Sequence, residues 1–184
     1  NMVYELANAN DQNRVTLVGF TKTLKMDVGP YYLTPDNTEY LVGLVNKIST
    51  GGGTRQDIGL KTAFQNHLNN SSESFNRGVN NTYTILITDG APVRSGNDAP
   101  ALGNANSSPT TAENGEIYGQ IKGWANQVKT KSNLMTVGLG MKDVTGGHSL
   151  LNQIASAGHF CALDDAEMLV KEMVEMGISD KKTI

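Results

Sequence analysis

The chain has 184 residues, of which 38% are hydrophobic, and its 15 Lys and Arg residues against 18 Asp and Glu give a net charge of −3. This length corresponds to one domain that can bury a core, and the composition excludes wholesale disorder. No apolar run approaches the roughly 18 residues that a membrane span needs. The mild acidity and the scattered basic residues argue against a nucleic-acid partner. The single cysteine, Cys161, excludes an internal disulfide framework and a Cys-based zinc site.

Short β-branched apolar runs alternate with segments of helical periodicity, which is typical of βα units around a largely parallel sheet. Val15–Phe20 is predicted to be a strand, and Thr21–Tyr32 to be a hairpin partner or an edge strand that ends at Gly29-Pro30. Thr34-Pro35 is typical of a capped helix start. One stripe of this helix is expected to be buried, formed by Leu41, Leu44, Val45 and Ile48.

The glycines at 51–53 interrupt the chain, and Thr54 is expected to cap a second helix. The apolar face of this helix is predicted to include Ile58, Ala63, Phe64 and Leu68. Tyr83–Thr88 is a continuous apolar run of the kind found in strands that are covered on both faces, and it stops at Asp89-Gly90. Ala91–Asn114 is rich in Pro, Gly, Asn and Ser and predicts a long loop.

The rest of the chain continues the same alternation of helices and strands. A helix is expected to bury Ile117, Ile121, Trp124, Ala125 and Val128. A strand at Leu134–Leu139, a helix that ends near Gly158, a short strand at Phe160–Leu163 and a last helix from Asp164 follow. Without an internal repeat or a second domain, the pattern predicts one α/β domain over residues 1–184.

Oxygen-bearing side chains fall where this pattern places the carboxyl ends of strands and the starts of helices, which is where ligands collect in open α/β sheets. Asp89 follows the apolar run directly, and Gly90 lets the backbone turn behind it. Thr54 presents a hydroxyl after the three glycines, which allow a ligand to approach the backbone closely. A carboxylate and a hydroxyl are ligands that Mg²⁺ prefers. Alternatively, Asp89 caps a turn and Thr54 is an ordinary helix N-cap.

Three segments resemble the von Willebrand factor A (vWA) domain family. GGGTRQDIGL at 51–60 is similar to the family's second metal-site segment, and TILITDGAP at 84–92 is similar to its third. IASAGHFCALDDAEML at 154–169 is similar to its last helix, strand and helix. The resemblance implies a Rossmann-like, doubly wound, mostly parallel sheet flanked by helices. It also implies a metal-ion-dependent adhesion site (MIDAS) at the carboxyl edge of that sheet.

The family's first segment, an Asp-x-Ser-x-Ser motif that ends the first strand, is absent. The nearest pattern, Asp143-Val144-Thr145, follows a late strand and is in the wrong place. In the family the first strand lies between the strands that match Val15–Phe20 and Tyr83–Thr88. The chain is therefore expected to be an N-terminally truncated fragment that begins inside the family's first helix, at Met2–Asn8. A replacement strand from another molecule and a true rearrangement remain alternatives.

The resemblance implies a function in binding rather than catalysis. Mg²⁺, or Mn²⁺ or Ca²⁺, would be held by Thr54 and Asp89, and an acidic residue of a protein partner would complete its coordination. Ligand contacts are expected from Gly53, Arg55, Asp57, Gly90 and Arg94, although solvation is the favoured explanation for Arg55 and Asp57. In the family, ligand capture is coupled to movement of the last helix, here Asp164–Met176.

The Asn-, Thr- and Gly-rich composition resembles that of bacterial surface or pilus adhesins of this family, so an extracellular or cell-surface location is expected. Two alternatives stay open: an intracellular subunit that docks onto an ATP-driven chelatase or chaperone complex, and an animal matrix or integrin-like binding domain. An enzyme is not expected, because the sequence has neither a Gly-x-x-x-x-Gly-Lys phosphate cradle nor a Ser/His/Asp grouping. The three histidines do not share a metal-binding spacing.

Overall fold

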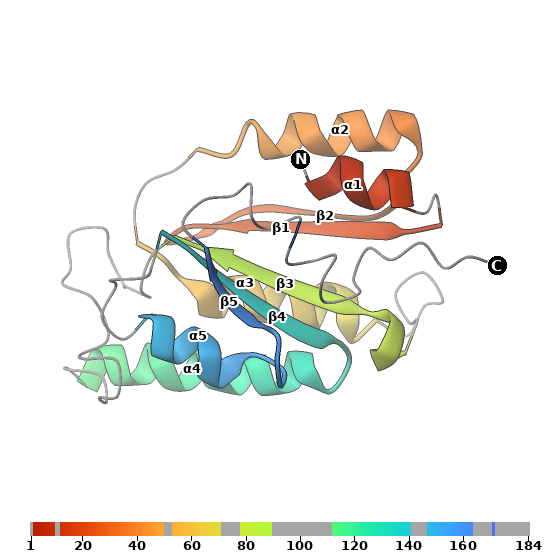
Figure 1. Cartoon of the computed structure of the whole chain (residues 1–184). Helices are drawn as coiled ribbons and strands as arrows, with labels where there is room; N and C mark the ends of the chain where they lie inside the picture. Colours follow the sequence, from red (N-terminus) through yellow and green to blue (C-terminus); the bar gives the residue numbers. More distant parts are fainter. Residues whose placement is uncertain are drawn as a thin grey trace.

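The computed structural model describes residues 2–9, 12–49, 53–70, 78–89, 112–140, 147–163 and 171. Within these ranges the chain forms a mixed α/β structure, with helices packed against two small sheets (Figure 1). No helix in the described part of the chain is both long enough and apolar enough to cross a membrane. The α/β class predicted from the sequence is confirmed, and the arrangement is compatible with a Rossmann-like fold.

A three-stranded parallel sheet forms the centre of the molecule. It consists of β3 (Tyr83–Thr88), β4 (Asn133–Leu139) and β5 (Phe160–Leu163), with β4 in the middle. All three strands lie within a residue of their predicted positions. Leu86 packs into the core on one face of β3, whereas Ile85 and Ile87 pack on the other face. The prediction that this strand is covered on both faces is therefore confirmed.

The main core lies between one face of this sheet and three helices. These helices are α3 (Gln56–Thr62), α4 (Ala112–Lys129) and α5 (Gly147–Ile154) (Figure 1). The buried residues of this core are Leu60, Leu86, Ile117, Ile121, Ala125, Val128, Leu134, Leu150, Leu151 and Ile154. Four of the five residues predicted to face inward on α4 are among them, and Trp124 packs against the cluster while only partly buried.

Two predicted boundaries differ from the structure. Helix α4 already begins at Ala112, so the last three residues of the predicted loop at 91–114 belong to the helix. Helix α5 ends at Ile154, four residues before Gly158, which adopts a positive φ of 76°. The rest of the loop lies outside the described residues, as does the predicted last helix apart from helical Lys171.

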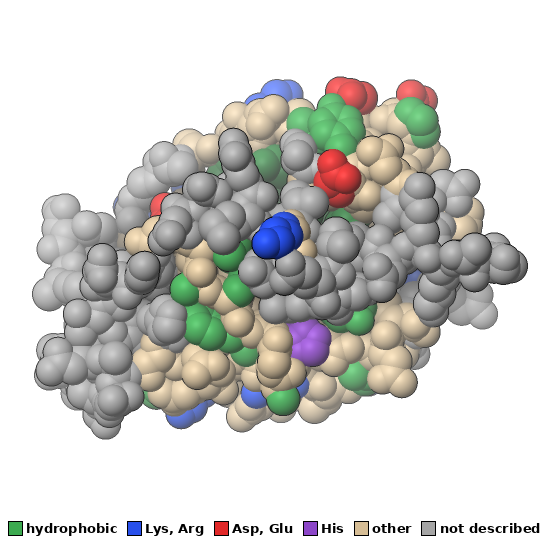
Figure 2. Space-filling view, in the orientation of Figure 1, with side chains coloured by type: hydrophobic (Ala, Val, Ile, Leu, Met, Phe, Trp, Pro, Cys, Tyr) green, Lys and Arg blue, Asp and Glu red, His purple; other side chains and the backbone are tan. Residues whose placement is uncertain are grey.

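A second, antiparallel sheet is formed by β1 (Arg14–Phe20) and β2 (Leu24–Tyr32). This confirms the hairpin alternative, although β2 continues two residues beyond Pro30. Helices α1 (Met2–Ala9) and α2 (Pro35–Val45) pack on the hairpin around a core of Val3, Leu33 and Leu41. Figure 2 shows hydrophobic and acidic side chains over these two helices.

The start of α2 agrees with the prediction and its end does not. The Thr34 hydroxyl accepts a hydrogen bond from the Asn37 N–H at 3.4 Å and caps the helix. Leu41 is fully buried, but Val45 is 41% exposed. The prediction for Val45 is wrong because the buried side runs through Thr38 and Leu41 and the helix ends at Val45 itself.

No strand pairing joins the two sheets within the described ranges. Helix α1 spans them on one side, because Leu6 packs against both the hairpin core and the far face of the parallel sheet. Helix α3 contacts both as well: Gly59 lies against Phe20 of β1, and Leu60 shares a core with Leu86 of β3. The absent strand that the sequence predicts between β1 and β3 stays a prediction.

The contact between Gly59 and Phe20 brings α3 unusually close to β1. A Cβ added at Gly59 would lie 2.5 Å from Phe20 Cδ1. Side chains are not accommodated at that distance, so any larger residue must push the helix or the ring away. Glycine at this position therefore sets the separation between α3 and the hairpin.

We expect Gly59→Ala to lower the free energy of unfolding by about 1–3 kcal/mol, because the added methyl group overpacks the contact with Phe20. Urea denaturation measures the change. Gly43→Ala is the matched control, since Gly43 lies within α2 and its added Cβ would meet no atom within 4 Å. That control is expected to be neutral or to stabilise by up to about 1 kcal/mol. Equal effects of the two variants would contradict the proposed steric role of Gly59.

Polar contacts join the segment that follows α3 to the hairpin. Helix α3 continues into a π-helical segment at Ala63–Leu68, which the sequence pattern did not indicate. From this segment the Asn66 amide donates to Asp27 Oδ2 on β2 at 2.6 Å, and His67 Nε2 contacts Asp27 Oδ1. Two consecutive residues thus contact the two oxygens of one carboxylate.

We expect Asp27→Ala to lower the free energy of unfolding by about 1–3 kcal/mol, because it removes the partner of two polar side chains at once. Thermal or urea unfolding measures this loss. Asp36→Ala serves as control, because Asp36 is an exposed residue in the first turn of α2 and contributes less than about 1 kcal/mol. A loss at Asp27 no larger than at Asp36 would show that the contact does not stabilise the fold.

Candidate functional site

The start of α3 and the carboxyl end of β3 meet at one edge of the structure. The Gln56 side-chain amide donates to Thr88 Oγ1 at 3.4 Å, and both side chains are buried. Thr54 lies two residues before Gln56, and Asp89 directly follows Thr88. The fold therefore places the segments that carry Thr54 and Asp89 at the same edge, as the sequence pattern predicts.

The predicted site residues differ in their environments. Asp89 is exposed, Thr54 is half-buried and the glycine at position 53 is buried. The prediction that Thr54 caps the helix is wrong, because the N-cap residue of α3 is Arg55. The Arg55 N–H donates to the Thr21 carbonyl at 3.0 Å, which ties this residue to the β1–β2 turn. Thr54 consequently lies before the helix.

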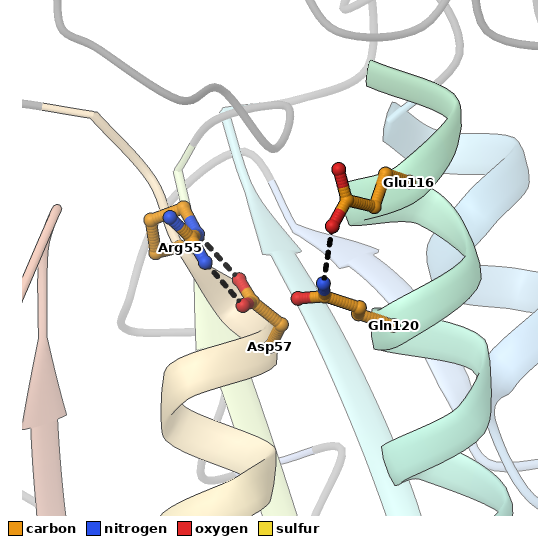
Figure 3. Close-up of polar contacts among 4 residues, drawn as sticks. All are labelled: Arg55, Asp57, Glu116 and Gln120. Atoms are coloured by element: carbon orange, nitrogen blue, oxygen red, sulfur yellow. Dashed lines mark hydrogen bonds and ion pairs between the residues drawn. The ribbon is translucent and has the colours of Figure 1, made fainter. Parts of the chain in front are cut away.

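Arg55 and Asp57 form a paired contact at the start of α3 (Figure 3). Arg55 Nε and Nη2 donate to the two carboxylate oxygens of Asp57 at 2.7 and 2.6 Å. Asp57 is only 4% exposed, so the prediction that it is solvated is wrong. The Arg55 guanidinium compensates the charge of this buried carboxylate. The sequence analysis did not predict this pair. Its one signal in the sequence is that two oppositely charged residues lie close together in the chain.

A negative charge on the neighbouring helix α4 also acts on this pair. Hydrogen bonding to Asp57 is the main cause that raises the pKa of Arg55 above its usual value. The charges of Asp57 and Glu116 act in the same direction, while burial opposes them. On α4 the Gln120 amide donates to Glu116 Oε1 at 3.2 Å, and both side chains lie beside the start of α3 (Figure 3). Arg55 thus stays a cation at every ordinary pH.

Three residues that the sequence analysis did not single out belong to this edge: Thr21, Gln56 and Thr88. The Thr21 hydroxyl is buried and makes no hydrogen bond within the described part of the chain, although the Thr21 carbonyl accepts from Arg55. No sequence signal marks Thr21, because it reaches this edge only through the turn of the hairpin.

The described side chains at this edge offer oxygen atoms of two kinds. Asp89 supplies an exposed carboxylate, and Thr54 and Thr21 supply hydroxyls. Among the described residues no group of three or more His, Cys, Asp or Glu side chains could hold a metal ion. The Asp89 carboxylate and the neutral hydroxyls are ligands that suit a hard cation such as Mg²⁺ better than zinc, and the exposed Glu116 carboxylate also lies beside the start of α3. Gly90 and Arg94, both predicted as ligand contacts, lie outside the described residues, as does Asp143.

Comparisons with known proteins support the fold. No protein-family model and no curated protein matches the chain. Among solved structures, the chain is similar to the crystal structure of the conserved hypothetical protein BatB from Bacteroides thetaiotaomicron. The TM-score is 0.55 at 14% sequence identity, with 96% of this chain and 86% of that chain covered. At this identity the similarity concerns the fold alone, and it supports a vWA-like fold without bearing on a metal site.

We expect Asp57→Ala to lower the free energy of unfolding by about 1–3 kcal/mol, because Arg55 loses the acceptor of two charged hydrogen bonds. Urea denaturation measures the effect. Asp57→Asn retains one acceptor oxygen and is expected to lose less. If the alanine variant were as stable as the parent chain, the ion pair would not hold the start of α3 in solution.

Proposed function

We propose that the chain is a metal-dependent binding module of the vWA type, without enzymatic activity. In this proposal Thr54 and Asp89 hold Mg²⁺, or Mn²⁺ or Ca²⁺, at the edge where α3 begins and β3 ends. An acidic residue of a protein partner binds the same ion. The hydrogen bond between Gln56 and Thr88 is the main support, because it brings together the two segments that carry the proposed metal ligands.

The residues at this edge fit part of a magnesium site. Asp89 is a carboxylate directly after a buried strand, and the Thr21 hydroxyl is a buried oxygen that lacks a partner among the described residues. Mg²⁺ favours such oxygens and keeps several waters. The family's remaining hydroxyl ligands belong to the absent Asp-x-Ser-x-Ser segment. In this chain waters would fill the remaining positions around the ion, and the proposal adds a further strand that supplies those family ligands, next to the edges of β1 and β3 that pair with no strand in the described ranges.

The neighbouring residues are proposed to bind the partner. Arg55 is 23% exposed in its side chain and keeps donors beyond the two that Asp57 uses, so it is placed to bind a second acidic group of the partner. Asp57 orients Arg55 and does not itself touch the metal. Gly53 and Gly90 would allow close approach to the backbone, and Arg94 would contribute charge. The composition supports a bacterial cell-surface or pilus adhesin as the setting.

Calorimetric titration of Mg²⁺ and Mn²⁺ into the chain tests this function. We expect a binding heat that Asp89→Ala abolishes and that Asp36→Ala, a change of an exposed carboxylate on α2, leaves intact. Asp57→Asn is expected to retain metal binding, because the Asp57 carboxylate of the parent chain binds Arg55 and not the metal ion. Circular dichroism establishes that each variant is folded. A folded parent chain that binds neither ion, or an Asp89→Ala variant that binds both, would contradict the proposal.

A further inference from the structure

The net negative charge of the chain is concentrated on α1 and α2. These two helices contain the acidic residues Glu5, Asp36 and Glu39 and no Lys or Arg, so their formal charge equals the −3 of the whole chain. All three acidic side chains are exposed. A surface that carries a single sign of charge attracts partners of the opposite sign.

No cation of the described residues forms an ion pair with these three carboxylates. The ion pairs in the described ranges lie elsewhere, at the start of α3 and between β2 and the π-helical segment. Glu39 accepts a hydrogen bond from the Tyr4 hydroxyl at 2.7 Å, which joins α1 to α2 without neutralising the charge. The acidic side chains of both helices are therefore available to a cation from outside the described structure.

Exposed tyrosines lie among these acidic side chains. Tyr4, Tyr32 and Tyr40 are 36%, 45% and 49% exposed, and they make up half of the exposed large hydrophobic side chains in the described ranges. Tyr40 directly follows Glu39 and lies one helical turn after Asp36. Figure 2 shows hydrophobic and acidic side chains next to one another over α1 and α2. We name this surface the acidic aromatic face, formed by Tyr4, Glu5, Asp36, Glu39 and Tyr40.

A guanidinium of the chain already packs on a tyrosine at the border of this face. Arg14 Cζ lies 5.6 Å from the centroid of the Tyr32 ring, and the Asn37 amide of α2 donates to the Tyr32 carbonyl at 2.9 Å. Tyr40 is held by an edge-to-face contact with Tyr31, and no cation of the described residues lies over its ring. Because a guanidinium both stacks on aromatic rings and binds carboxylates in a bidentate manner, arginine suits a surface that offers both groups.

From these observations we propose that the acidic aromatic face binds an arginine-rich segment of a protein partner. Arginine side chains of that segment pair with the Asp36 and Glu39 carboxylates and stack on Tyr40. Charge complementarity favours this occupant over a second copy of the chain, because two copies of the face would repel each other. Helices α1 and α2 lie on the side of the molecule away from α4, and this binding does not depend on the proposed metal function (Figure 1).

Fluorescence anisotropy tests the proposal with a labelled peptide in which arginines alternate with serine and glycine. A saturable rise in anisotropy is expected at physiological salt, whereas a peptide with glutamine in place of arginine is expected not to bind. Glu39→Gln removes a charge but keeps an oxygen that accepts from Tyr4, and it is expected to weaken binding about threefold. Tyr40→Ala is expected to weaken binding about threefold as well, and Tyr40→Phe, which keeps the ring, is expected to retain the parent affinity.

Glu116→Gln is the matched control, because it removes one exposed negative charge from α4 and changes the net charge equally. It is expected to leave peptide binding intact, and circular dichroism establishes that each variant is folded. The absence of saturable binding by the arginine peptide would overturn the proposal. Equal losses in Glu116→Gln and Glu39→Gln would overturn it too, because binding would then reflect net charge alone. Self-association of the parent chain that Glu39→Gln abolishes would also do so, because a second copy would then occupy the face.

Discussion

The close packing of α3 is the constraint on which the rest of the described structure depends. This one helix contacts the hairpin through Gly59 and the parallel sheet through Leu60, although no strand pairing joins those sheets in the described ranges. Its far end is fastened to β2 by the contacts of Asn66 and His67 with Asp27. The separation of the two sheets therefore follows from where α3 lies, together with α1, whose Leu6 packs against both.

The packing of α3 also determines which side chains are available at the candidate metal edge, where α3 begins and β3 ends. The start of α3 is held by the Thr21 carbonyl, by the pairing of Arg55 with Asp57 and by the contact of Gln56 with Thr88. Both oxygens of the buried Asp57 carboxylate are occupied by Arg55, whereas the Asp89 carboxylate is exposed. In the proposed function, Asp89 and the neighbouring hydroxyls hold the metal ion and Arg55 binds the acidic partner.

The amino-acid sequence by itself determined the class of fold and the position of nearly every described strand, because apolar periodicity records which side chains are buried locally. It also predicted that the segments of Thr54 and Asp89 meet at one edge, because helix starts and the carboxyl ends of strands lie together at the ligand-binding edge of open α/β sheets. Only the tertiary structure decided that Arg55 rather than Thr54 is the N-cap, that Asp57 is buried and that Val45 is exposed. The sequence analysis also did not predict the π-helical segment at Ala63–Leu68. Each of these depends on which residue of a distant segment lies opposite, and a local pattern does not record that.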